Sequence, residues 1–274
     1  MRYSIFKTFL LLKIFMDSFL FSQTIDSIFT KEDTLLYKGY EVKKSYDSQK
    51  GVWFATLKKD GKIIFTFENG YRKEMTQFGL FAFLGRDEKQ LIVEQYSGGA
   101  HCCWSYWIIN FSPDFRVIYD SQEYSVGYPL QPVDLDQDGV FEFSQLILTF
   151  DYFDRLSHAI SPFPIAVFKY DKNMKCYIPA NTKFSPYITQ GIEEDIKKVK
   201  EFNGRTNFTT YDDSMGKYLS MILQVSLTYI YAGKEREAWL FYDKEYKLRD
   251  KAEMKSKIRE QLKNCSIYKY IYGR

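Results

Sequence analysis

Four carboxylates lie close together in residues 134–142, which read Asp-Leu-Asp-Gln-Asp-Gly-Val-Phe-Glu. The three aspartates occupy alternate positions, so their side chains can converge on one point, and the glycine permits a sharp turn. Negative oxygens at this spacing repel one another strongly unless a cation lies among them, and flexible oxygen coordination favours Ca²⁺ over Mg²⁺. The alternative is a solvated acidic turn without metal. The calcium ligands that the spacing predicts are Asp134, Asp136, Asp138, the backbone carbonyl of Val140, and Glu142.

The acidic segment does not have the pattern of an EF-hand. An EF-hand loop needs a bidentate Glu at its twelfth position, where this chain has Gln145, and a strand-like run follows in place of a helix. The segment instead resembles the calcium loop of FG-GAP, or VCBS-type, repeats, which form the blades of the integrin α-chain propeller. Their pattern is Asp-x-Asp-x-Asp-Gly-x-x-Asp followed by a strand. The residues that match it in order are Asp134, Asp136, Asp138, Gly139 and, as Glu in place of the final Asp, Glu142.

This resemblance covers residues 132–148, and the chain contains one such loop. It implies that a calcium ion ties a loop between strands and has a structural role. A complete propeller needs at least four blades of four strands, which is more than residues 23–190 can supply. We therefore expect one or a few blade-like sheets.

A second cluster of reactive side chains lies at residues 96–104, which read Tyr-Ser-Gly-Gly-Ala-His-Cys-Cys-Trp. It is similar to the Ser-Gly-Gly-Ala-His-Cys-Cys stretch of uncharacterised bacterial secreted proteins with an Asp-rich loop downstream, a resemblance that implies no particular activity. A thiol nucleophile, Cys102 or Cys103, activated by His101 is one interpretation. Adjacent residues of a strand point to opposite faces, which makes contact between neighbours awkward. Zinc would need four ligands, and the remaining Cys and His residues have no recurring metal spacing.

Structural disulfide bonds are the preferred interpretation of the four cysteines, because an exported protein is expected to oxidise an even number of them. A bond between the two adjacent cysteines would be strained, since neighbouring Cα atoms are only about 3.8 Å apart. We expect one of them to pair within the β region and the other to fasten the helices to the sheet. The disulfide candidates are Cys102, Cys103, Cys176 and Cys265.

The first 22 residues read as a secretory signal peptide. Arg2 and Lys7 precede an apolar run that ends in the small residue Ser22. Lys13 and Asp17 interrupt the run, so a retained amphipathic anchor is the alternative to cleavage. No later stretch contains the roughly 18 apolar residues of a membrane helix. The predicted location is therefore periplasmic or extracellular, with no transmembrane span after the signal is removed.

Composition predicts a folded chain with no electrostatic affinity for nucleic acid. The 274 residues include 24 Phe, 23 Tyr and 4 Trp, and 27% of them are charged, which is ample material for a core and its surface. The net charge is only +3, whereas nucleic-acid-binding proteins carry a larger excess of Lys and Arg on one face. A protein or a cell-surface component is the partner class that remains.

The elements that must position these residues fall into two regions. Short β-branched and aromatic runs between turn residues predict an antiparallel sheet over about 36–185, with an Asp60-Gly61 hairpin turn. Apolar residues at steps of three and four predict helices over about 190–266. The strands expected are 52–57, 63–67, 91–96, 105–111, 115–120, 141–150 and 164–170, and the helices expected are 193–200, one ending near Gly233, one around Trp239 and one capped by Asp250.

The fold class predicted is α+β, with blade-like antiparallel sheets followed by a C-terminal helical hairpin or bundle. The function predicted is an exported, calcium-stabilised binding or structural module without catalytic activity. One alternative is the thiol-dependent enzyme at residues 101–103. The other is a helical adaptor for a protein partner, since Tyr229, Gly233, Ala238 and Tyr242 stand at tetratricopeptide-like offsets in a single unit. Exposure of Trp239 together with Tyr242 would favour the adaptor.

Overall fold

The computed structural model describes residues 28–70, 72–85, 88–98, 104–205 and 214–273. The signal-like segment 1–22 therefore lies outside the described residues. The described chain is α+β, with antiparallel sheets first and helices at the C-terminal end, which confirms the predicted fold class. None of the described helices is long and apolar enough to cross a membrane.

The described strands form three four-stranded antiparallel sheets, and within each sheet consecutive strands are neighbours. A four-stranded meander of this kind is the architecture of a propeller blade. Sheet 1 contains β1 (Thr34–Tyr37), β2 (Tyr40–Asp47), β3 (Val52–Lys59) and β4 (Lys62–Gly70). Sheet 2 contains β5 (Thr76–Phe81), β6 (Gln90–Tyr96), β7 (Trp104–Asn110) and β8 (Arg116–Asp120). Sheet 3 contains β9 (Val126–Val133), β10 (Glu142–Ile147), β11 (Ile165–Asp171) and β12 (Cys176–Pro179).

The predicted hairpin between β3 and β4 is present. Asp60 and Gly61 adopt φ angles of 50° and 75°, as a tight turn with two left-handed residues requires, and Lys59 pairs with Lys62 across it. All seven predicted strands are found, although β10 ends at Ile147, before the predicted end at residue 150. The strands β1, β2, β5, β9 and β12 were not predicted.

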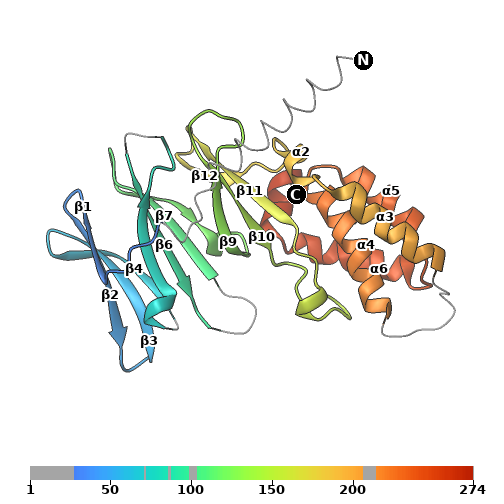
Figure 1. The fold of residues 1–274 in the computed structure, drawn as a ribbon, viewed down its shortest axis with the longest axis horizontal. Helices are drawn as coiled ribbons and strands as arrows, with labels where there is room; N and C mark the ends of the chain where they lie inside the picture. Colours follow the sequence, from blue (N-terminus) through green and yellow to red (C-terminus); the bar gives the residue numbers. More distant parts are fainter. Residues whose placement is uncertain (1–27, 71, 86–87, 99–103, 206–213, 274) are drawn as a thin grey trace, which may run out of the picture.

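The three sheets lie in a row and end against the helices (Figure 1). Successive residues of a strand point to opposite faces, so the central sheet serves two interfaces. Leu91 and Val93 of β6 belong to the apolar cluster shared with sheet 1, whereas Ile92 belongs to the cluster shared with sheet 3. Each interface is therefore filled by alternate residues of the same strands.

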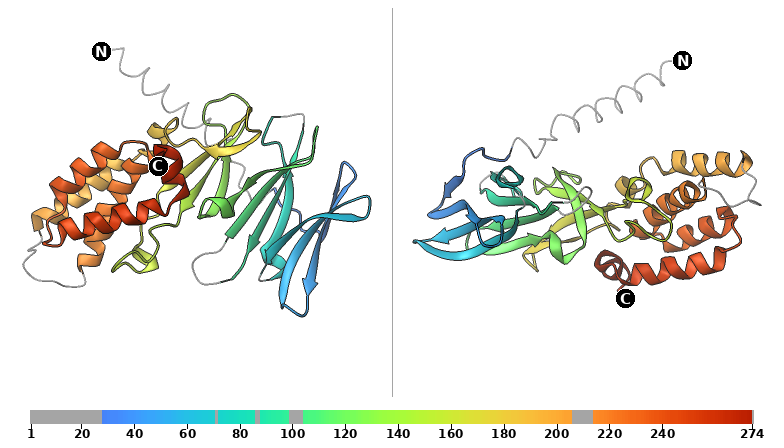
Figure 2. Two further views of the ribbon diagram at one scale, coloured as in Figure 1. Left: turned by 180° about the vertical axis from the view of Figure 1, so that it is seen from behind. Right: turned by 90° about the horizontal axis from the view of Figure 1, so that it is seen from below.

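The C-terminal region is a bundle packed beside sheet 3 (Figures 1 and 2). Its central helix is α4 (Ser214–Tyr231), in which Tyr218, Ile222 and Val225 are fully buried, in agreement with the spacing of three and four residues that predicts a helix here. Leu219 and Leu223 are fully buried as well, because other helices cover further sides of α4. The helices are α2 (Ser185–Ile188), α3 (Ile192–Arg205), α4 (Ser214–Tyr231), α5 (Glu235–Glu245), α6 (Lys251–Lys263) and α7 (Ser266–Tyr272).

Two details of the helices differ from the sequence predictions. Asp250 is the N-cap residue of α6, but its side chain makes no capping hydrogen bond. Its carboxylate instead accepts hydrogen bonds from Arg155 and from the Tyr246 hydroxyl. The helices α2 and α7 were not predicted, since their four and seven residues are too few to show a clear period.

One apolar cluster continues from sheets 2 and 3 into the helical bundle. It includes Phe143 and Phe168 of sheet 3 together with Ile222 of α4 and Leu262 of α6, all fully buried. The β region and the helical region therefore share a core, and the acidic loop at the start of β10 projects from a strand that this core holds.

Candidate metal centre

Residues 134–141, which include the three aspartates, form the loop that joins β9 to β10. Val133, the last residue of β9, pairs with Glu142, the first residue of β10, so the loop is anchored by a strand pair at its base. Gln137 and Gly139 have φ angles of 59° and 81°, which place both in the left-handed region. A glycine adopts this conformation without strain, which is why the turn can be sharp at Gly139.

The loop is also closed by its own carboxylates. Asp134 accepts the backbone N–H groups of Asp138 and Gly139, each at 3.1 Å. Asp138 accepts the backbone N–H of Val140 at 2.9 Å. These contacts draw the alternate aspartates together, and one carboxylate oxygen from each of Asp134, Asp136 and Asp138 lies within 4.8 Å of the others. The convergence expected from their spacing is therefore present.

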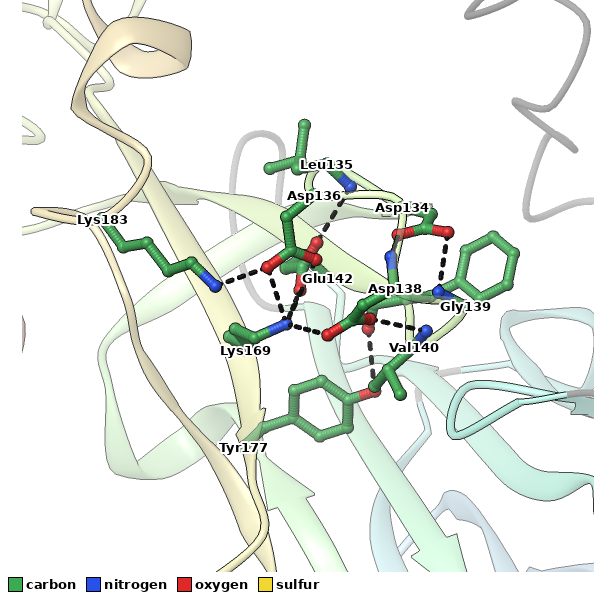
Figure 3. A network of polar contacts seen from close by, with 11 residues as sticks. Asp134, Leu135, Asp136, Asp138, Gly139, Val140, Glu142, Lys169, Tyr177 and Lys183 are labelled. Carbon is green, nitrogen blue, oxygen red and sulfur yellow. Dashed lines mark hydrogen bonds and ion pairs between the residues drawn. The ribbon is translucent and has the colours of Figure 1, made fainter.

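A lysine ammonium group lies among the carboxylates (Figure 3). The Nζ atom of Lys169 is 3.1 Å from Asp136, 3.0 Å from Asp138 and 2.6 Å from Glu142. The side chain of Lys169 is 19% exposed, so its charge is largely withdrawn from water. Lys183, which follows β12, forms a second ion pair with Asp136. Asp134 lies on the other side of the loop in the same view.

Strand register explains why Lys169 reaches this position. Phe143 of β10 pairs with Phe168 of β11 in antiparallel register, so the next residue of β11, Lys169, stands opposite Glu142. Opposite charges on facing strands attract, and here the loop adds two aspartates above the pair. Neither Lys169 nor Lys183 was among the predicted site residues. A lysine directly after the apolar run 164–168, within the predicted strand 164–170, was the available signal, but the register was needed to place it.

Glu142 is the buried base of the cluster. Its side chain is fully buried, with Oε1 on the Lys169 ammonium and Oε2 accepting the backbone N–H of Leu135 at 2.9 Å. Burial raises the pKa of Glu142, and this effect outweighs the opposing hydrogen bonds from Lys169 and Leu135. The predicted ligand Glu142 therefore lies at the cluster and binds Lys169.

The other charges of the cluster stabilise one another. Partial burial alone would raise the pKa of Asp136, but the hydrogen bonds and positive charges of Lys183 and Lys169 outweigh it and lower that pKa. The pKa of Asp138 is lowered in the same way, with Lys169 and the N–H of Val140 opposing the effect of burial. Burial would lower the pKa of Lys169, yet its three carboxylate partners raise it overall.

The donor set fits a hard divalent cation, because it consists of carboxylate oxygens that already converge on a positive charge. The Lys169 ammonium occupies the place of a cation between Asp136 and Asp138, and it marks where positive charge is stabilised. Two lysines offset part of the charge of four carboxylates, so the cluster retains a negative excess. Val140 contributes its backbone N–H within the loop.

Gln145 occupies the position at which an EF-hand would place its bidentate Glu, and it is directed elsewhere. It is almost fully buried in β10. Its side-chain oxygen accepts the Tyr119 hydroxyl of sheet 2, and its Nε2 donates to the Gly127 carbonyl at 3.1 Å. The loop is followed by a strand, which agrees with the sequence interpretation against an EF-hand.

The reactive side chains of the Cys-His cluster lie outside the described residues. This applies to His101, Cys102 and Cys103, so the thiol-enzyme and disulfide predictions at these positions remain predictions. Cys176, half-buried in β12, and Cys265, buried before α7, are both free thiols in the structure. Burial raises the pKa of Cys176, which reduces its thiolate fraction and its reactivity.

The second histidine has a structural environment. His158 begins a short 3-10 helix, and its Nδ1 lies 2.9 and 3.0 Å from the two carboxylate oxygens of Asp151. Its ring is packed between Tyr152 and Phe163. These contacts hold the segment between β10 and β11 in place.

The exposure of the helical aromatics bears on the adaptor hypothesis. Tyr242 is fully buried and Trp239 is half-buried, so the two do not form one exposed patch.

Comparison of the chain with protein-family models, with curated proteins and with solved structures finds no match in any of the three.

Proposed function

We propose that the protein is an exported, non-catalytic structural or binding module whose acidic loop binds Ca²⁺. The observation that carries the proposal is the convergence of Asp134, Asp136 and Asp138, with oxygen atoms within 4.8 Å of one another, next to the Lys169 ammonium that pairs with two of them. Carboxylate and carbonyl oxygens bind hard divalent cations, and calcium accepts irregular oxygen coordination more readily than magnesium does.

Calcium and the lysine ammonium would compete for the same oxygens. The residues that would hold the ion are Asp134, Asp136 and Asp138, supported by Glu142 and the carbonyl of Val140. A bound calcium ion supplies two positive charges where Lys169 supplies one, and it would neutralise the remaining negative excess. Lys169 would then serve as the internal counter-charge when calcium is scarce, because unpaired carboxylates this close would destabilise the folded state.

The position of the loop supports a structural role for the ion. The loop joins β9 to β10, and Lys169 and Lys183 come from β11 and from the segment after β12. A cation bound by the carboxylates of this loop would therefore fix the connection between β9 and β10. The N-terminal sequence 1–22 supports export, and calcium concentrations outside the cytoplasm suit weak extracellular sites.

Thermal unfolding in calcium and in chelator tests the proposal. Saturating calcium should raise the melting temperature of the unmodified protein, since a ligand at 100 times its Kd stabilises by about 2.7 kcal/mol. Asp136→Ala should lower the melting temperature in calcium and abolish its dependence on added calcium. Lys169→Met should be less stable than the unmodified protein in chelator and should gain more from calcium.

A matched control is Asp195→Ala, which removes a partly exposed aspartate paired with Lys198 on α3. It should keep the full response to calcium. Equal melting temperatures in calcium and chelator for both the unmodified protein and Lys169→Met would refute the calcium site. The acidic loop would then be a purely internal ion-pair network.

A further inference from the structure

A pocket of about 590 Å³ lies among α5, α6 and α7, apart from the acidic loop. These are the last three helices of the bundle (Figure 2). The described residues that line the pocket are Glu235, Trp239, Arg259, Lys263, Tyr268 and Lys269. They combine two aromatic side chains with three positive charges and one negative charge.

The aromatic walls of the pocket are fixed by its one carboxylate. Glu235 accepts a hydrogen bond from the Trp239 indole at 3.2 Å and another from the Tyr268 hydroxyl at 2.9 Å. Tyr268 is only 6% exposed, and Trp239 is half-buried. The first bond lies within α5 and the second joins α7 to α5, so both rings are held in place before any ligand arrives. The negative charge of Glu235 is engaged in this role.

The positive groups are exposed at the mouth. The Arg259 guanidinium lies 4.9 Å from the centre of the Trp239 ring, a cation–π contact that orients it over the aromatic wall. Among the described residues, neither Arg259 nor Lys269 forms an ion pair with a carboxylate. Lys263 pairs only with Glu260, an exposed contact of little energy. Three cations therefore converge on a pocket whose only acidic lining residue in the described chain is already hydrogen-bonded.

We propose that this pocket binds a small organic anion, namely a carboxylate attached to an apolar or aromatic body. The half-buried ring of Trp239, backed by the buried Tyr268, provides apolar contact area, while the guanidinium of Arg259 can bind a carboxylate through two parallel hydrogen bonds. Lys263 and Lys269 add long-range attraction at the mouth. The site is independent of the acidic loop, which recruits a cation at sheet 3.

Phenylacetate is the probe for this pocket, with its neutral analogue phenylacetamide and the small anion acetate as comparisons. The readout is the indole N–H resonance of Trp239 in the full chain, identified by its loss in Trp239→Phe. Phenylacetate should shift this resonance in a saturable manner, with and without calcium. Phenylacetamide should bind about tenfold more weakly, because it lacks the charge that Arg259 recognises. Acetate should bind more weakly as well, because it lacks the apolar body.

The variant that tests the charge is Arg259→Gln, which should weaken phenylacetate binding about tenfold while the melting temperature stays close to that of the unmodified protein. The matched control is Lys197→Gln, an exposed lysine on α3 that does not line the pocket, and it should bind normally. Absence of a saturable shift, or equal binding of phenylacetate and phenylacetamide, would overturn the proposal. Loss of the calcium response with phenylacetate binding intact would refute the acidic-loop site alone.

Discussion

Asp136 is held by two ammonium groups, and its pKa in the folded protein is lower than its ordinary value. A carboxyl whose folded-state pKa is depressed contributes stability that is present above its unfolded pKa, near 3.9, and is lost as the pH falls through the folded value. Asp136→Asn should therefore lower the free energy of unfolding by about 1 kcal/mol at neutral pH. The difference from the unmodified protein should shrink below about pH 4.

Denaturant unfolding of both proteins in chelator, at several pH values between neutral pH and about pH 3, measures this difference without interference from calcium. Asp195→Asn, which removes an exposed ion pair with Lys198, serves as the control and should change the free energy of unfolding little. A difference for Asp136→Asn that stays constant across the range would show that the two lysines do not stabilise the ionised form of Asp136.

The end of α4 depends on a glycine that no other residue replaces without strain. Gly233 has a φ of 78°, and a Cβ atom built on it would lie 2.7 Å from Cγ2 of Thr182. Gly233→Ala should therefore destabilise the protein by about 1–2 kcal/mol, from the left-handed backbone and from crowding. Gly204, in the last turn of α3, has open space and no positive φ.

Gly204→Ala is consequently the matched comparison, and its effect should have the opposite sign. Alanine loses less backbone entropy than glycine when a helix forms, so this variant should gain up to about 0.5–1 kcal/mol. Chemical unfolding followed by circular dichroism measures both variants. Equal effects at the two positions would mean that the conformation of Gly233 does not control how the chain leaves α4.

The shared core makes sheet 3 and the helical bundle one cooperative unit, whereas sheet 1 has an apolar cluster with sheet 2 alone. Phe168→Ala, in β11, should destabilise the protein by about 3–5 kcal/mol and increase hydrogen exchange in β9–β12 and α4 together. Leu57→Ala, in β3, should cost about 2–5 kcal/mol and increase exchange in β1–β4 while the helices stay protected. Exchange that rises in sheet 3 but not in α4 after the first substitution would contradict a common core.

Local patterns in the sequence predicted much of the secondary structure. Alternating or continuous β-branched runs predicted β3, β4, β6, β7, β8, β10 and β11. The Asp60-Gly61 pair predicted a hairpin, because two adjacent left-handed residues are needed there. The strands that were missed, such as β2 and β9, carry Lys, Ser, Gly or Pro within them. Cross-strand pairing and packing stabilise these strands more than intrinsic propensity does.

The candidate site was predicted only in part, because some of its residues form a local pattern and others come from distant segments. Alternate aspartates followed by Gly139 are a local pattern, and the convergence of Asp134, Asp136 and Asp138 agrees with it. Lys169 lies at the site because of the register between β10 and β11, and Lys183 lies there because the chain after β12 passes the acidic loop. Both depend on sheet 3 as a whole. The pocket among α5, α6 and α7 likewise joins Trp239 to Arg259 and Tyr268 across three helices.

The order of residues alone thus determined seven of the described strands and the helices with a clear period, and it determined that three aspartates turn toward one point, because these outcomes depend on neighbours in the chain. Only the tertiary structure decided that Lys169 lies among the carboxylates, that Glu142 is buried beneath them and that α4 shares a core with sheet 3. Those outcomes depend on which distant segments pack together. A buried charge is tolerated only where that packing places an opposite charge beside it.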